Sequence, residues 1–325
     1  MTTHKNPSSF SRMLIFAAFL ALSATLTFAA PGQKTFASPQ EAAKAFADAC
    51  EKQDTAALIA LVGPGSEELI NSGDQAQDTR RRERFAALAK ESTDVRPDPY
   101  YPDRFLVYVG GRSWPLPIPI VKIGDDYRFD ASVARTDILA RRIGKNELDA
   151  IEFLHGFVRA EVEYAYSDSN HDDMRDYAQS LVSTPGKQDG LYWETADGQF
   201  DGPGVDFAAD LIAYGYDLPA SGEPMLYRGY IYKILKAQGA HATGGARDYV
   251  VKGSMIGGFA MVAYPAEYGV SGVKTFVVNQ DDVVWEKDLG AKTKVLAAAL
   301  KAYDPDKGWV ESPRIEPETS AETKP

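Results

Sequence analysis

One long amphipathic segment, residues 146–170 (NELDAIEFLHGFVRAEVEYAYSDSN), constrains the fold more than any other feature of the chain. Its apolar residues recur at the three- and four-residue spacing of an α-helix. Aromatic residues widen the stripe, and a helix with so wide an apolar face must be buried, here against a sheet. The stripe comprises Leu148, Ile151, Leu154, Val158, Val162 and Ala165, widened by Phe153, Phe157 and Tyr164.

The residues after this helix predict an antiparallel meander. An irregular stretch, residues 187–223, is rich in Gly, Asp and Pro, and five β-rich segments then alternate with turn residues. Residues 273–278 and 283–287 flank the turn NQDD and predict a hairpin, with Phe276 facing a core and Lys274 reaching water. A last helix over AKTKVLAAALKAY follows, and the Pro- and Glu-rich end of the chain predicts a disordered tail over residues 306–325.

The region before the long helix predicts a separate α+β domain over residues 36–132. Ser38, Pro39 and Glu41 have the spacing of a helix N-terminus, a second short helix starts at Asp54, and a third covers residues 79–90. Strand signals follow. In the segment RSWPLPIPIVKI, prolines alternate with apolar residues, so the missing N–H groups fall along one side, which predicts an edge strand. The overall fold class is therefore α+β, with a second domain over residues 133–305.

Three resemblances follow from this order of elements. Residues 146–165 with GYIYKIL, YVVKG and the run from Gly258 to Gly290 resemble the exported family of unknown function DUF2950. The helix and meander are also similar, more distantly, to the globular heads of type IV pilins and pseudopilins, although a cleavable signal and an α+β domain replace the apolar pilin helix. The first domain weakly resembles the NTF2-like fold. These resemblances imply an exported protein but no particular activity.

The N-terminus predicts export. Lys5 and Arg12 precede an apolar run over residues 13–28, and Thr27-x-Ala29 forms a cleavage motif, so residues 1–29 are interpreted as a signal peptide. The run is shorter than the roughly 20 residues of a membrane span. We expect a periplasmic or secreted location and no integral membrane span after cleavage. The mature chain would keep 33 basic and 46 acidic residues, a surface that disfavours nucleic acid and anionic lipid.

The acidic turn DSNHDDMRD offers the best metal candidate, a calcium loop. Asp168, Asn170 and Asp172 alternate as the ligands of such loops do, and Asp173 extends the acidic run. However, Asp173 occupies the sixth position, where glycine is usual, and Gln179 occupies the twelfth, where a bidentate glutamate is usual. The turn is therefore either a calcium site or a solvated acidic turn. No His or Cys pairing predicts zinc.

Other polar segments leave two interpretations open. Arg80, Arg81, Arg82 and Arg84 form either a solvated helix face or an anion site. The loop over residues 183–204, with Lys187, Asp189, Tyr192, Trp193 and Glu194, either lines a ligand groove or packs onto the helix as a staple. Cys50, the single cysteine, lies on the apolar side of a helix pattern and is expected to be buried.

The sequence contains no nucleophile elbow, phosphate-binding loop or dinucleotide fingerprint. Two functional hypotheses remain. The first is a non-enzymatic cell-envelope protein that binds a protein partner or assists an assembly. The second is a periplasmic enzyme or ligand-binding protein, with its pocket in the cone of the first domain or under the loop over residues 183–204.

Overall fold

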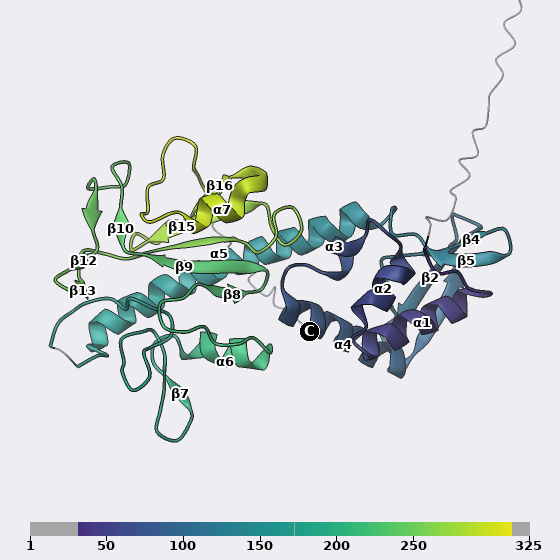
Figure 1. Cartoon of the computed structure of the whole chain (residues 1–325), viewed down its shortest axis with the longest axis horizontal. Coiled ribbons are helices and arrows are strands. Elements are labelled where there is room, and N and C mark those ends of the chain that lie inside the picture. The colour runs from purple at the N-terminus through teal and green to yellow at the C-terminus, as the bar shows by residue number, and fades with distance from the viewer. Residues whose placement is uncertain (1–31, 172, 314–325) are drawn as a thin grey trace, which may run out of the picture.

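A computed structural model describes residues 32–171 and 173–313, which form two lobes joined by one long helix (Figure 1). Each lobe has its own hydrophobic core. The α+β class is confirmed, because helices and antiparallel sheets occur in both lobes. The predicted signal peptide, residues 1–29, lies outside the described residues.

The first lobe consists of four helices followed by a five-stranded sheet. Ser38 caps α1 by accepting a hydrogen bond from the Glu41 N–H at 3.2 Å, as predicted, and Asp54 caps α2. The third predicted helix starts earlier than expected, because Asp74 caps it. The elements are α1 (Pro39–Glu51), α2 (Thr55–Val62), α3 (Glu67–Ile70), α4 (Gln75–Glu91), β1 (Thr93–Pro97), β2 (Arg104–Val109), β3 (Trp114–Pro115), β4 (Ile120–Ile123) and β5 (Asp126–Phe129).

The proline-rich segment does not form one edge strand. It splits into β3, which pairs only with β2, and β4, which lies between β2 and β5. Residues 116–119, which include Pro117 and Pro119, interrupt the ladder because proline has no N–H to donate. The edge-strand prediction is therefore wrong for the β4 half.

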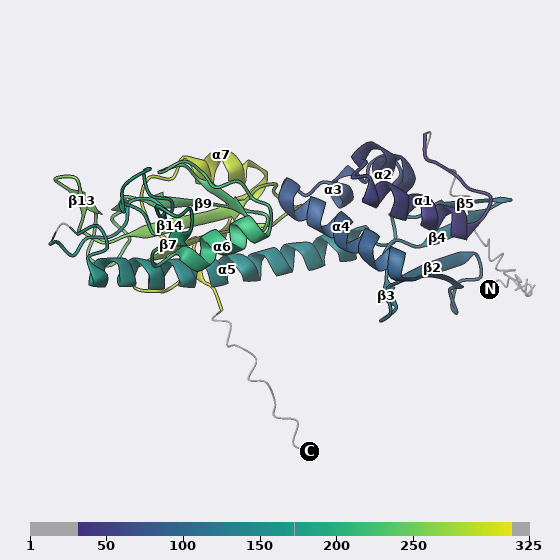
Figure 2. The ribbon, with the colours of Figure 1, turned by 90° about the horizontal axis from the view of Figure 1, so that it is seen from below.

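Helix α5 (Arg135–Ser167) is longer than predicted and belongs to both lobes. Its first turns pack Ile138 and Leu139 against the first core, and its later turns enter the second core. Figure 2 shows the helix extending from one lobe into the other. The predicted stripe is wrong at Leu148 and Val162, which are exposed, because the buried face in the second lobe is instead centred on Phe153, Phe157 and Tyr164.

The second lobe is built on a six-stranded antiparallel sheet in the order β17-β16-β15-β14-β9-β8. Helix α5 packs on one face and α7 on the other (Figure 2). The main elements are β8 (Met225–Tyr227), β9 (Tyr230–Leu235), β14 (Ala260–Pro265), β15 (Lys274–Asn279), β16 (Trp285–Asp288), η1 (Gly290–Lys292), α7 (Thr293–Ala298) and β17 (Val310–Glu311).

Short elements complete the second lobe. They are β6 (Trp193–Glu194), β7 (Phe200–Asp201), α6 (Val205–Ala213), β10 (Ala237–Gln238), β11 (Arg247–Asp248), β12 (Val250–Val251) and β13 (Ser254–Met255). Helix α6 lies in the stretch that the sequence assigned to irregular structure. Residues 306–313 were predicted to begin a disordered tail, but they include β17, which pairs with β16 at the sheet edge.

The predicted hairpin is present as β15 and β16, in which Lys274 faces Asp288 and Val277 faces Trp285. Its burial differs from the prediction. Thr275 through Asn279 are all buried, so both faces of β15 are covered rather than one. A second hairpin, β8–β9, turns at Gly229, where φ is +81° and an added Cβ would lie 2.4 Å from Asn146 Nδ2. Only glycine fits this turn.

Candidate functional site

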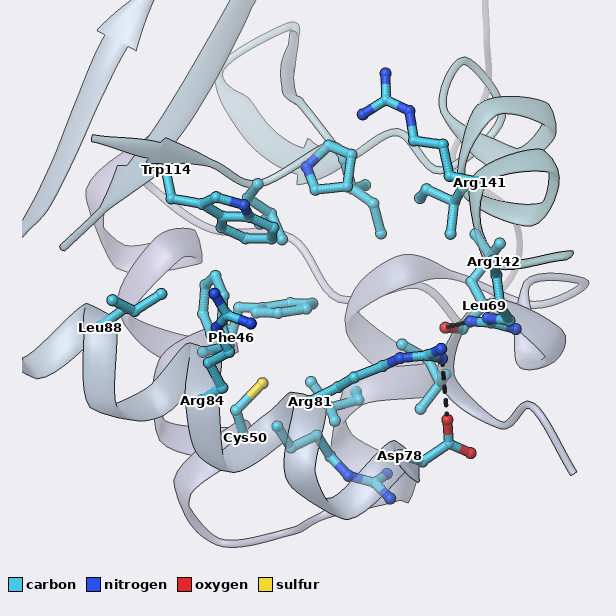
Figure 3. A pocket seen from close by; sticks show the side chains of 18 of the residues that line it. Phe46, Cys50, Leu69, Asp78, Arg81, Arg84, Leu88, Trp114, Arg141 and Arg142 are labelled. Carbon is cyan, nitrogen blue, oxygen red and sulfur yellow. Dashed lines mark hydrogen bonds and ion pairs between the residues drawn. The ribbon is translucent and has the colours of Figure 1, made fainter. Parts of the chain in front are cut away.

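A pocket of about 500 Å³ lies in the first lobe, between the helices and the proline-rich segment (Figure 3). Side chains from α1 to α4 form one side. The segment after β3 and the first turns of α5 form the other. The volume falls in the range of about 300–1,000 Å³ that is usual for small-molecule sites.

The interior of the pocket is apolar and aromatic. Phe46 packs edge-on against Phe85, with ring centroids 5.2 Å apart, and Trp114 meets Phe85 at 6.4 Å. Pro117 belongs to the stretch between β3 and β4, and this segment contributes side chains to the pocket lining. The remaining apolar lining is Cys50, Leu58, Leu69, Ile70, Leu88, Leu116, Ile118 and Ile138.

The charged residues that line the pocket are mostly basic. Six carry a positive charge and two a negative charge. The whole chain has a net charge of −11, so this local excess of positive charge runs against the charge of the protein as a whole. An apolar cavity with a basic lining favours an anionic ligand electrostatically. The basic residues are Arg81, Arg82, Arg84, Arg141, Arg142 and Lys145, and the acidic ones are Asp78 and Asp137.

Asp78 and Arg142 are the buried charged residues of the site, and Arg81, whose side chain is 40% exposed, lies beside them (Figure 3). Arg142 donates to the backbone carbonyls of Glu68 and Leu69 at 2.6 and 2.8 Å, and Arg81 Nη1 lies 3.6 Å from Asp78 Oδ1. Burial and the neighbouring Arg81 lower the pKa of Arg142 to about 10, so it stays protonated at neutral pH. Burial also raises the pKa of Asp78, opposed by the Ser72 N–H, which donates at 2.8 Å.

The pocket also holds guanidinium groups with free donors. The Arg84 side chain makes no hydrogen bond or ion pair with any residue that the structure describes. Arg82 donates from Nη1 to Thr55 Oγ1 at 2.9 Å, but its Nε is buried without a partner. Arg141 reaches only Asp137, at 3.4 Å, and both side chains are largely exposed. The α4 arginines therefore keep side-chain donors available beside the pocket, and anion binding by this run stays a prediction.

Cys50 is buried, as predicted, and lies in the pocket wall. Burial raises its pKa to about 12, because a thiolate would be poorly solvated there. The thiol is therefore protonated at neutral pH and contributes apolar surface.

The sequence model of the family described as Protein of unknown function (DUF2950) matches residues 33–311. The chain belongs to the DUF2950 family. The matched region contains every residue that lines the pocket. No curated protein and no solved structure gives a significant match, so the similarities to pilin heads and NTF2-like domains stay predictions.

In this DUF2950 protein the candidate calcium residues lie in the turn after α5. Asp168 ends the helix with φ +48° and accepts from the Asp173 N–H at 3.2 Å, while Asn170 donates to Asp176 at 3.2 Å. Asp172 lies outside the described residues. Within residues 32–171 and 173–313, no group of three or more His, Cys, Asp or Glu side chains is arranged to hold a metal ion. Calcium binding stays a prediction.

The loop over residues 183–204 packs onto the core of the second lobe. Tyr192 is fully buried, and its backbone pairs with residues 181–183, whereas Glu194 is exposed in the β6–β7 hairpin. Lys187 and Asp189 lie 3.9 Å apart on the surface, and Trp193 is half-buried. These contacts match the interpretation in which the loop packs onto the fold, rather than the one in which it lines a ligand groove.

The family run from Gly258 to Gly290 forms β14, β15 and β16 with their turns, so in this DUF2950 protein it is the centre of a sheet. His155 pairs with Asp282 at 2.6 Å, and His241 pairs with Asp304 at 3.1 Å. Among the helices of residues 32–171 and 173–313, none combines the length and the hydropathy of a membrane span.

Proposed function

We propose that this DUF2950 protein is an exported, non-enzymatic binding protein of the cell envelope, and that the pocket of the first lobe is its ligand site. This function combines the first hypothesis, a non-enzymatic cell-envelope protein, with one form of the second hypothesis, a protein that binds a small ligand in a pocket of the first domain. Export rests on the predicted signal peptide over residues 1–29 and implies a periplasmic or secreted location. The single observation that carries the binding role is an apolar pocket with a basic lining in an acidic protein.

The chemistry of the lining favours binding over catalysis. Arginine and lysine stay protonated at neutral pH and so serve poorly as general bases. Asp78 is engaged by Ser72 and Arg81, and the Cys50 thiol has a pKa raised to about 12. A nucleophile needs an adjacent base to activate it, and the residues that line this pocket include no such pair.

The fluorescence of N-phenyl-naphthylamine, a neutral apolar dye, tests whether the pocket admits small molecules. We expect the dye to bind the mature protein and Ile138→Trp to abolish its binding, because Ile138 is half-buried in the pocket wall and a larger ring there fills the cavity. Ala140→Trp is the matched control, since Ala140 is exposed on the same helix and does not line the pocket. Equal dye binding by both variants would place the binding site elsewhere.

Export is tested separately by fractionating cells that express the full chain. We expect the protein in the periplasm or the medium, with an N-terminal residue close to Ala30. A cytoplasmic protein that retains residues 1–29 would refute this part of the proposal. Multiple turnover of a small-molecule substrate at this pocket would refute the non-enzymatic part.

A further inference from the structure

We propose that the ligand of the pocket is an amphiphilic anion, a small molecule with an apolar acyl or aromatic body and one carboxylate or phosphate head. This inference rests on the proposed function, because it assigns a chemical class to the same site. Its basis is the juxtaposition of an aromatic and aliphatic interior with arginines on two facing helices, α4 and α5.

The apolar interior of the pocket favours a ligand with an apolar body. Phe46, Phe85 and Leu58 are buried, and twelve of the twenty residues that line the pocket are uncharged and apolar. A ligand that covers this surface gains roughly 25 cal/mol for each Å² of apolar area removed from water. A purely polar anion, such as free phosphate, would leave this surface in contact with water and forgo that gain.

The arginines that line the pocket favour a negatively charged head group on the ligand. Arg142 is held by two backbone carbonyls and Arg81 by Asp78, so both supply positive potential from fixed positions. Arg84 on α4 and Arg141 on α5 keep donors available, because Arg84 has no partner among the described residues and Arg141 makes one long, exposed contact. Guanidinium groups match the planar, bidentate geometry of carboxylates and phosphates.

Size and overall charge exclude a polymeric anion. The pocket volume of about 500 Å³ suits one small molecule. The net charge of −11 over the whole chain opposes the long-range attraction that nucleic-acid binding requires. The site is therefore an isolated basic patch with an apolar interior.

Calorimetric titration of the mature protein with four matched probes tests the class. Dodecanoate carries both features, dodecanol lacks the charge, dodecyltrimethylammonium reverses it, and inorganic phosphate lacks the body. We expect dodecanoate to bind about ten-fold more tightly than dodecanol, and dodecyltrimethylammonium and phosphate to bind more weakly still. The advantage of dodecanoate should shrink as salt rises, because its head is near the solvent.

Variants then locate the head. Arg84→Gln and Arg141→Gln should each weaken dodecanoate binding about 2- to 5-fold, the range for a partly exposed ion pair, and leave dodecanol binding unchanged. Arg112→Gln is the control, since Arg112 is exposed in the same lobe and does not line the pocket. A fall with Arg112→Gln as large as with the other two would mean that the charge effect is not local to the pocket.

The two proposals fail differently. If dodecanol and dodecyltrimethylammonium bind as tightly as dodecanoate, and Ile138→Trp abolishes binding of all three, the pocket is a ligand site but the anionic class is wrong. If inorganic phosphate, which has no apolar body, binds as tightly as dodecanoate, the pocket does not recognise the apolar body. The amphiphilic class is then wrong. If no probe binds, or Ile138→Trp has no effect, the proposed function itself fails.

Discussion

Asp74 connects the two lobes, and its replacement by alanine is expected to destabilise both. The carboxylate is fully buried and caps α4 by accepting from the Gln77 N–H at 3.0 Å. It also accepts from Tyr216 Oη and from the Gly229 N–H, each at 2.7 Å, and both of these donors belong to the second lobe. One side chain therefore serves a helix terminus and an interface.

The magnitude follows from these three bonds. Loss of a helix cap costs about 1 kcal/mol, and hydrogen bonds to a charged group contribute about 1.5–3 kcal/mol each. Asp74→Ala should thus lower the free energy of unfolding by about 4 kcal/mol or more, since it leaves two buried donors unsatisfied. Asp54→Ala is the matched control, because Asp54 is exposed and caps α2 through the Ala57 N–H alone, at a cost of about 1 kcal/mol.

Urea unfolding followed by tryptophan fluorescence measures this difference. Trp114 reports on the first lobe, and Trp193, Trp285 and Trp309 report on the second. Asp74→Ala should shift the transitions of both lobes to lower urea, whereas Asp54→Ala should shift only the first. A double-mutant cycle with Tyr216→Phe should give a coupling free energy of about 0.5–3 kcal/mol. Equal destabilisation by Asp74→Ala and Asp54→Ala would refute the interface role.

Three further predictions concern single groups. Burial raises the pKa of Glu161 well above 4.5, so its protonated form stabilises the folded state; this stability is complete below pH 4.5 and is lost as pH rises through the folded pKa. Glu161→Gln should flatten this pH dependence of the free energy of unfolding, measured by urea titration at pH 5 and pH 8. The same pH dependence in the variant and the native protein would contradict the prediction. Ellman's reagent should leave Cys50 unmodified in the native protein and label it in urea, because its pKa is about 12; rapid native labelling would show an accessible thiol. Millimolar calcium should raise the melting temperature and Asp168→Asn should remove the increase, whereas an unchanged melting temperature in the native sequence would exclude the calcium loop.

Elements with strong local periodicity could be predicted from the sequence. The long helix, the β15–β16 hairpin and the caps at Ser38 and Asp54 depend on residues that are close along the chain. The start of α4 was missed because the Asp74 cap precedes a polar first turn with no apolar repeat. Helix α6 was missed because the surrounding Gly and Pro residues resemble a loop.

Burial was harder to predict than secondary structure. Leu148 continues the apolar repeat of α5, yet it is 52% exposed because the helix there passes between the two cores. Asn146, two residues earlier, is fully buried because it bridges the lobes, accepting from Gln77 and donating to the Ser271 carbonyl. The sequence of a helix shows that it is amphipathic, but its neighbours decide which turns are covered.

The pocket depends on contacts between distant segments, and these explain why the arginine run alone left two interpretations open. Arg84 lies on α4, whereas Arg141 and Arg142 lie on the first turns of α5, which continues into the second core. Asn146 and Asp74 then join these turns and α4 to the second lobe. The second lobe therefore holds in place the helix that forms the basic wall of the pocket, although it contributes no lining residue beyond that helix.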